Sequence, residues 1–203
     1  MKKILCFGDS NTFGFNPKNF QRYTIKERWS GILKTELSNY TIIEKGCNNR
    51  CGFNNNENSE LCGYKSLKDE LKNDIDVVIL QIGINDTQIQ YQTNEETIEN
   101  GLKRLINIIK ATNNKAEIII LCPSVINENI LNSYFKILFN KESIKLSKKI
   151  SGIYKKVCAE TNCHCIDLND ISTISSIDGL HYDIENHQKI ANYLMVYLKK
   201  ILI

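Results

Sequence analysis

Five short apolar runs, each followed by a polar loop and then a helical pattern, constrain the fold of this chain more than any other feature. The apolar runs cover residues 4–7, 40–44, 76–82, 116–121 and 163–168, and the helical patterns cover residues 27–38, 64–72, 94–112, 141–161 and 184–201. Strands that alternate with helices form parallel sheets with helices on both faces. We therefore predict an α/β three-layer sandwich with a five-stranded parallel sheet in the flavodoxin-like order 2-1-3-4-5.

Length, composition and charge limit the classes of protein. The 203 residues, 42% of them hydrophobic, suit a single domain over residues 1–203. A net charge of +3 without a long Lys/Arg cluster argues against a nucleic-acid or lipid partner. The first apolar run, residues 4–7, is shorter than the roughly 7–15 residues of a secretory signal, and no run approaches the ~18 residues of a membrane span. We therefore expect a cytoplasmic protein that does not enter the membrane.

The eight cysteines do not follow a metal-binding or disulfide pattern. Cys47, Cys51 and Cys62 lack the spacing of zinc ligands. Alternation along a strand sends His164 to the face opposite its neighbours Cys163 and Cys165. A cytoplasmic chain of this length needs no disulfide framework. We therefore expect reduced, mostly buried thiols, no metal and no cofactor.

Two polar motifs follow the first and third predicted strands. Gly8-Asp9-Ser10 ends the first strand, and the segment of residues 83–86, Gly-Ile-Asn-Asp, ends the third. In the order 2-1-3-4-5 both motifs lie at the switch point where such sheets bind ligands. Gly8 would allow a sharp bend, and Ser10 would be a nucleophile beside backbone N–H groups of an oxyanion hole. A turn with a helix cap explains the same tripeptide when it is taken alone.

The chain has three histidines, and His181 is the best candidate for a general base. Asp178 precedes it by three residues, so in one tight turn the carboxylate would accept from Nδ1–H while Nε2 faces Ser10. An Asx-turn with a chance histidine is the alternative. We expect a packing role for His164 in the fifth strand, and we expect His187 near the start of the last helix to be exposed.

Taken together, these motifs resemble the GDSL, or SGNH, hydrolase superfamily over nearly the whole chain. The segments of residues 6–15, 28–33, 83–87 and 178–181 are similar to those of bacterial arylesterase- and acyltransferase-like members. The resemblance implies a catalytic triad of Ser10, Asp178 and His181. It also implies an oxyanion hole formed by the Ser10 backbone N–H, the Asn85 side chain and a backbone N–H after the second strand.

Two positions depart from the family pattern. Asn49 stands where the family has glycine, and we assign it the third oxyanion donor because Asn tolerates left-handed φ. Asn11 stands where the family name has leucine, and we expect this change to leave the site unaffected. Asp9 and Asp86, beside the motif residues, are expected to hold the two loops through backbone N–H groups rather than to transfer protons.

Aromatic side chains are the candidates for the substrate pocket. Residues 133–139 resemble the aromatic stretch that the arylesterase-like members place over the acyl site. Phe13, Phe15, Phe135 and Phe139 are therefore candidate pocket residues, with core packing as the alternative for each.

The sequence thus predicts a serine esterase that hydrolyses short-chain, acetyl-type esters of small molecules through an acyl-enzyme. A carbohydrate O-acetyl esterase is an alternative, because the Asn-rich loop at residues 51–60 would hydrogen-bond to sugar hydroxyls. A non-catalytic module that binds a phosphorylated ligand is disfavoured, since the three motifs contain Asp9 but no Lys or Arg. We also expect a homo-oligomer, because arylesterase-like relatives often assemble.

Overall fold

The computed structural model describes residues 1–71 and 74–202. Five strands form one parallel sheet, and their bounds are β1 (Lys2–Gly8), β2 (Tyr40–Gly46), β3 (Val77–Gln81), β4 (Glu117–Cys122) and β5 (His164–Asp167). The strand order β2-β1-β3-β4-β5 confirms the predicted order. The carboxyl ends of the first three strands are level, because Gly8 pairs with Gly46 on one side and with Gln81 on the other.

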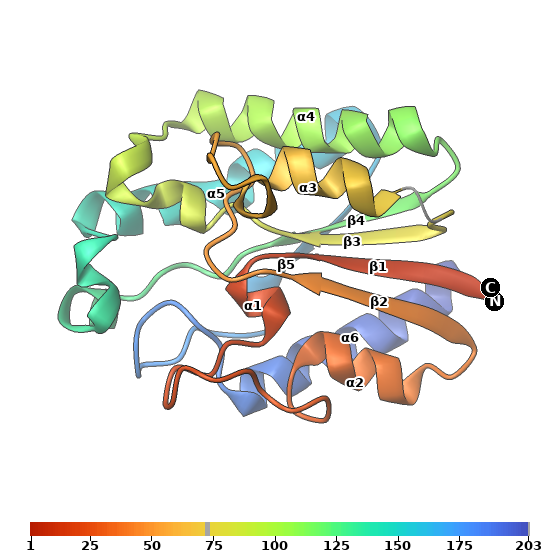
Figure 1. Cartoon of the computed structure of the whole chain (residues 1–203), viewed down its shortest axis with the longest axis horizontal. Helices are drawn as coiled ribbons and strands as arrows, with labels where there is room; N and C mark the ends of the chain where they lie inside the picture. Colours follow the sequence, from red (N-terminus) through yellow and green to blue (C-terminus); the bar gives the residue numbers. More distant parts are fainter. Residues whose placement is uncertain (72–73, 203) are drawn as a thin grey trace.

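Helices cover both faces of the sheet, as predicted (Figure 1). On one face lie α3 (Gly63–Glu70), α4 (Glu95–Thr112) and α5 (Lys141–Thr161), and on the other lie α2 (Trp29–Glu36) and α6 (Ile184–Ile201). The bounds of α5 and α6 match the prediction, whereas α2 and α3 are shorter than expected, and Lys72 of the predicted third helix lies outside the described residues. Within residues 1–71 and 74–202, no helix combines the length and the apolar character that crossing a membrane requires.

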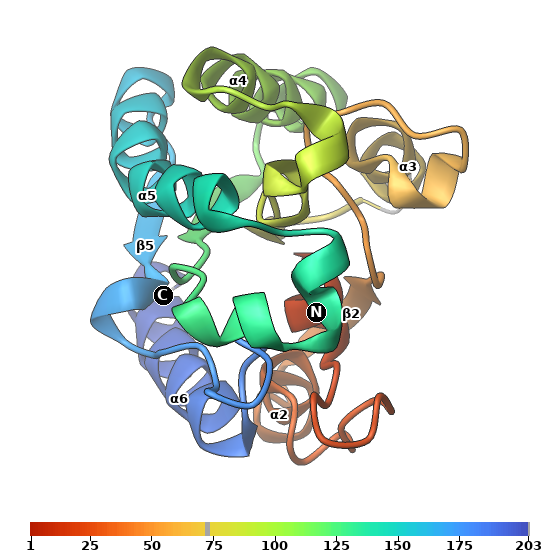
Figure 2. The same ribbon diagram turned by 90° about the vertical axis from the view of Figure 1, so that its left-hand side faces the viewer.

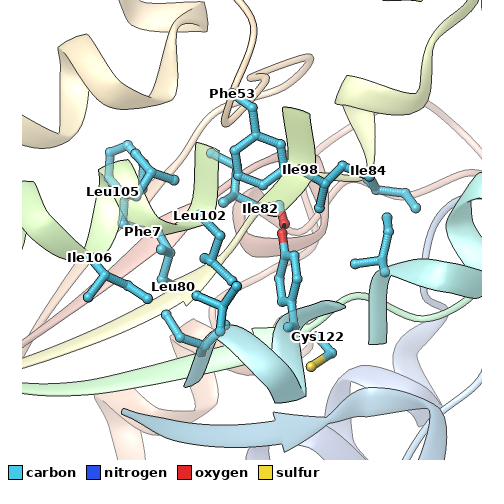
Figure 3. Close-up of a cluster of buried hydrophobic side chains, with 14 of the residues drawn as sticks. Phe7, Phe53, Leu80, Ile82, Ile84, Ile98, Leu102, Leu105, Ile106 and Cys122 are labelled. Carbon is cyan, nitrogen blue, oxygen red and sulfur yellow. Dashed lines mark hydrogen bonds between the residues drawn. The ribbon is translucent and has the colours of Figure 1, made fainter. Parts of the chain in front are cut away.

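Apolar side chains fill both interfaces between the sheet and the helices. Leu5 and Phe7 of β1 point to the face covered by α4, where Phe7 and Leu80 approach Leu102 (Figure 3). The alternate residues of β1, Ile4 and Cys6, belong to the second cluster, which packs against α2 and α6. A strand buried on both faces has a continuous apolar sequence, and this explains the run that begins the chain.

Loops gather at the carboxyl-end edge of the sheet. The four-residue helix α1 (Ser10–Phe13) follows β1 directly, and residues 125–140 cross in front of this edge (Figure 2). The Asp86 carboxylate fixes the loop after β2 by accepting from the backbone N–H groups of Gly52, Phe53 and Asn54 at 2.6–2.9 Å. Asp9 accepts in the same way from the Asn11 N–H at 2.9 Å. The structural roles predicted for both aspartates are confirmed.

Two glycines let α1 lie against the strand ends. A Cβ on Gly8 would be 2.1 Å from the Gln81 carbonyl oxygen, and a Cβ on Gly46 would be 2.0 Å from the backbone nitrogen of Phe13. Gly8 does not have a positive φ, so its backbone conformation alone does not require glycine. It is required because neighbouring backbone comes too close for any side chain.

Replacing Gly46 with alanine should destabilise the protein by about 1–3 kcal/mol, because the new methyl group overlaps backbone that cannot move freely. The matched control is Gly152→Ala in α5, where an added Cβ meets nothing within 4 Å. That change should stabilise the protein by about 0.5–1 kcal/mol, because alanine is the better helix former. Urea unfolding measures both effects. Equal stability of the two variants would contradict this account of the packing.

Candidate active site

The predicted nucleophile lies at the start of α1. Asp9 caps this helix, and Ser10 is its first residue, 4% exposed, directly beyond the end of β1. Its Oγ is 2.9 Å from Nε2 of His181, which is 171 residues away in the sequence. The fold therefore brings these two predicted site residues into hydrogen-bond contact.

Asp178 holds the imidazole of His181 from the other side. Its Oδ2 is 2.6 Å from His181 Nδ1, and its Oδ1 accepts from the backbone N–H groups of Leu180 and His181 at 2.9 and 3.0 Å. Burial would raise the pKa of Asp178, but the hydrogen bonds from His181 and the backbone outweigh it and hold that pKa below its usual value. The Asp178 side chain is therefore a carboxylate at neutral pH.

Asn85 and Asn49, the other two residues predicted for the oxyanion hole, line the same cavity as Ser10 and His181. Asn85 is 3% exposed, and its Nδ2 donates to the carbonyl oxygen of Arg50 at 3.1 Å. Asn49 has a φ of 61°, the left-handed conformation for which glycine is usual and which asparagine tolerates. The side chains of Asn49 and Asn85 both accept from Nε2 of Gln88, at 2.7 and 3.1 Å.

A cavity of about 120 Å³ opens between these groups. Its polar wall consists of Ser10, Asn48, Asn49, Asn85, Gln88 and His181, and its apolar wall consists of Phe15, Phe135, Leu138, Phe139 and Leu180. The structure thus brings together the predicted site residues of five separate segments, including three of the four predicted pocket aromatics. Asp178 lies behind the imidazole, 5% exposed.

Phe13 is a predicted pocket residue that lies elsewhere. Its ring packs under the guanidinium of Arg22, 4.7 Å from the ring centre, and it is not among the described residues that line the cavity. Gly14, with a φ of 85°, ends α1 between Phe13 and Phe15, so the chain turns and Phe15 faces the cavity instead. The Phe15 ring centre is 4.4 Å from that of His181.

His187 is fully buried, and the expectation that it is exposed is wrong. It lies on the face of α6 that Ile190, Ala191 and Leu194 also occupy, and this helical spacing is a signal that the sequence contained. Its Nδ1 accepts from the Trp29 N–H at 3.4 Å, and its Nε2 has no hydrogen-bond partner among the described residues. Burial lowers the pKa of His187 to about 3.

Two further expectations concern β5: that His164 is a packing residue, and that His164 and Cys165 point to opposite faces of the strand. His164 contacts the Tyr197 hydroxyl at 2.9 Å and Glu117 Oε2 at 3.2 Å, as expected for a packing residue. On the opposite face, the Cys165 sulfur is 3.5 Å from that of Cys122. The predicted alternation along this strand is confirmed.

Asn11, which stands where the family name has leucine, makes two hydrogen bonds to the backbone beside His181. Its Nδ2 donates to the Leu180 carbonyl oxygen, and its Oδ1 accepts from the Tyr182 N–H, both at 3.2 Å. The amide therefore holds the backbone on both sides of His181. A leucine side chain has no donor or acceptor and cannot make these bonds.

A parallel sheet with a hydrogen-bonded Ser-His-Asp group at its carboxyl edge is typical of serine hydrolases. The model of the GDSL-like lipase/acylhydrolase family matches residues 4–194. The chain belongs to this family.

Solved structures with known activities share the fold. A carbohydrate acetylesterase from Sinorhizobium meliloti aligns with a TM-score of 0.88 and 24% identity, covering 99% of this chain and 100% of that chain. The M. smegmatis aryl esterase aligns with a TM-score of 0.90 and 21% identity over the same shares of the two chains. At these identities the likeness shows the fold. None of the curated proteins compared with the chain matches it.

The burial of His187 predicts how stability depends on pH. Its folded pKa of about 3 is below the ordinary 6.5, so the unfolded chain takes up the proton first as the pH falls. This contribution to stability is complete above pH ~6.5 and is lost between that pH and about 3. Between pH 7.5 and 5.0, the wild type should lose about 2 kcal/mol more unfolding free energy than His187→Asn, whose side chain does not titrate.

Urea unfolding of both proteins at the two pH values measures this difference. Asp9 and Asp86, whose pKa values burial raises to about 7 and about 6, give the opposite slope. Both aspartates are present in each protein, so their effects cancel in the comparison. Parallel stability curves would rule out the buried, neutral imidazole.

Proposed function

We propose that this protein is a serine esterase that hydrolyses short-chain, acetyl-type esters of small molecules through an acyl-enzyme. One observation carries the proposal. The Ser10 hydroxyl, 2.9 Å from His181 Nε2, faces a small cavity, and Asp178 holds the far side of the same imidazole at 2.6 Å. Family membership supports the reaction class.

The proposed reaction begins when Ser10 Oγ attacks the ester carbonyl. His181 Nε2 accepts the hydroxyl proton, and the resulting imidazolium is stabilised by the Asp178 carboxylate at Nδ1. The imidazolium then gives its proton to the leaving alkoxide, and the alcohol departs. Water enters, transfers a proton to His181 and attacks the acyl-enzyme carbonyl, and His181 returns the proton to Ser10 as the acid leaves.

Three N–H groups are available for the negative oxygen that forms in this reaction. The backbone N–H groups of Ser10 and Asn49 have no hydrogen-bond acceptor among the described residues. Asn85 Nδ2 gives one hydrogen to the Arg50 carbonyl oxygen and keeps a second one for the cavity. We propose that these three groups bind the oxyanion.

The size of the cavity supports a short acyl group. Its volume of about 120 Å³ is well below the ~300–1,000 Å³ of pockets that enclose drug-sized molecules. Phe135, Phe139 and Leu138 line its apolar side, which suits a methyl group better than a charged one. An acetyl group fits this description, whereas a long acyl chain does not.

Substitutions of the site residues should lower turnover by different amounts, according to the step of the reaction that each residue supports. Ser10→Ala should abolish the release of acetate from 4-nitrophenyl acetate, because no nucleophile remains. Asp178→Asn should lower turnover by up to ~10⁴, since the imidazole loses its tautomer control. Asn85→Ala should cost about 10²–10³, the effect of one oxyanion donor. His164→Ala, the control, should retain wild-type turnover.

A fluorophosphonate probe separates the esterase from a phosphate-binding module. An activated serine reacts with this probe, so the wild type should be labelled and Ser10→Ala should not. Wild-type turnover by Ser10→Ala, or the absence of labelling in the wild type, would overturn the proposed function.

A carbohydrate O-acetyl esterase is the second candidate. The Asn-rich loop at residues 51–60, which suggested this candidate from the sequence, supports it less in the structure. None of its residues is among the described residues that line the cavity. The side chains of this loop bond to protein groups instead, Asn54 to Asp86, Asn55 to Tyr64 and Asn56 to Tyr91. What supports the candidate now is the polar wall at Asn48 and Asn49 and the fold shared with a carbohydrate acetylesterase.

Turnover of aryl acetates and acetylated sugars at equal concentration distinguishes the two candidates. We expect kcat/KM to favour the aryl ester by a hundredfold or more, about 2.7 kcal/mol of transition-state binding, because Phe15 and Phe135 stand at the cavity. A preference for the acetylated sugar would identify the second candidate as correct.

We further propose that the protein is a cytoplasmic homo-oligomer. Large apolar side chains near the cavity support assembly, since Phe20, Tyr134 and Ile137 are 56%, 71% and 68% exposed. The cysteines are free thiols, which supports a reducing compartment.

A further inference from the structure

We propose that Gln88 is a positioning residue that fixes the orientation of both Asn49 and Asn85. It thereby keeps the amide nitrogen of Asn85 directed at the substrate oxygen. This inference rests on the proposed esterase function, and it goes beyond that function by assigning a role to a residue that contacts neither Ser10 nor His181 in a hydrogen bond.

Gln88 lies where two segments of the site meet. It is 2% exposed and links the 3₁₀ turns Asn85–Thr87 and Ile89–Tyr91. Its Nε2 donates to Asn49 Oδ1 at 2.7 Å and to Asn85 Oδ1 at 3.1 Å. An amide nitrogen has two hydrogens, so both are used, one on the loop after β2 and one on the turn after β3.

These contacts allow Asn85 one amide orientation. The Asn85 Oδ1 faces the donor Gln88, and its Nδ2 faces the acceptor oxygen of Arg50 at 3.1 Å. A flipped Asn85 would place donor against donor at Gln88 and acceptor against acceptor at Arg50. In a buried site such mismatches cost a hydrogen bond at each end. The second Nδ2 hydrogen therefore stays on the cavity side.

The same amide holds Asn49 in its left-handed conformation. A φ of 61° costs a non-glycine residue free energy, and the 2.7 Å bond to Gln88 helps to offset this cost. Glycine at position 49 would have no side chain to bond. The Asn49–Gln88 contact thus joins the proposed backbone donor of one segment to the proposed side-chain donor of the other.

Gln88→Glu is the sharpest test, because it replaces the shared donor with a carboxylate of the same shape. The carboxylate faces two carbonyl oxygens and favours the flipped Asn85, whose oxygen would then point at the oxyanion. We expect kcat on 4-nitrophenyl acetate to fall by about 10²–10³, as for the loss of one donor, with KM changed by less than about threefold. Gln92→Glu is the matched control on the exposed surface and should keep wild-type kcat.

A pH profile distinguishes positioning from a general loss of structure. A protonated glutamic acid at position 88 donates a hydrogen bond again, so the ratio of variant to wild-type kcat/KM should rise as the pH falls from 8 to 5. A merely structural defect would leave this ratio flat or lower it in acid. A flat or falling ratio, or a Gln88→Glu enzyme as active as Gln92→Glu, would overturn the inference.

Gln88→Met keeps the inference testable if the glutamate variant does not fold. Methionine fills a similar volume without donors, and we expect kcat to fall about tenfold with KM unchanged. A Gln88→Met enzyme with wild-type kcat would also overturn the inference. The proposed function fails in a different way, since the wild type itself would then neither hydrolyse the ester nor react with the fluorophosphonate probe.

Discussion

The close approach of α1 to the ends of β1 and β2 is the constraint on which the site depends. The absence of side chains at Gly8 and Gly46 lets the first turn of α1 lie on backbone rather than on side chains. Polar contacts then hold it there, because Gln81 Oε1 accepts from Thr12 Oγ1 at 2.9 Å and from Trp29 Nε1 at 3.1 Å. The position of Ser10 is therefore set by the sheet itself. The loops supply the residues that contact Ser10, but they do not determine where it lies.

A buried ion pair ties the loop that carries Phe15 to the same end of the sheet. Glu44 of β2 accepts from Arg28 at 2.7 and 2.9 Å and from Ser30 Oγ at 2.8 Å. Burial would raise the pKa of Glu44, but the hydrogen bonds from Arg28 and Ser30 hold it below its usual value. A buried pair of this kind contributes little net stability compared with apolar packing, because both charges leave water. We interpret it as a contact that specifies how the loop after α1 lies on β2, which in turn fixes where Phe15 enters the cavity.

The sequence predicted the strands and helices, which have a periodic apolar pattern, and missed single side-chain contacts between distant segments. The sheet, its order and the bounds of α5 and α6 followed from apolar periodicity along the chain. The carboxyl-end motifs likewise identified Ser10 and His181 as neighbours. Asn11 and Gln88 were missed because each acts through one side-chain amide on a distant segment, and such a bond leaves no pattern along the chain. Phe13 was predicted beside Phe15 as a pocket residue because the effect of Gly14 on side-chain direction depends on three-dimensional structure.

The contrast between two buried histidines shows how the environment sets the function of a side chain. His181 and His187 are 2% and 0% exposed, so burial does not distinguish the two imidazoles. His187 has two tyrosine rings beside it and no carboxylate in hydrogen-bond contact among the described residues, and burial lowers its pKa to about 3. His181 has Asp178, whose charge is supported by two backbone N–H groups of the turn as well as by the imidazole. Because these N–H groups belong to the Asx-turn, the carboxylate keeps hydrogen-bond donors when the imidazole is neutral. The Asx-turn and the charge partner of His181 are therefore one structure, although from the sequence they looked like alternatives.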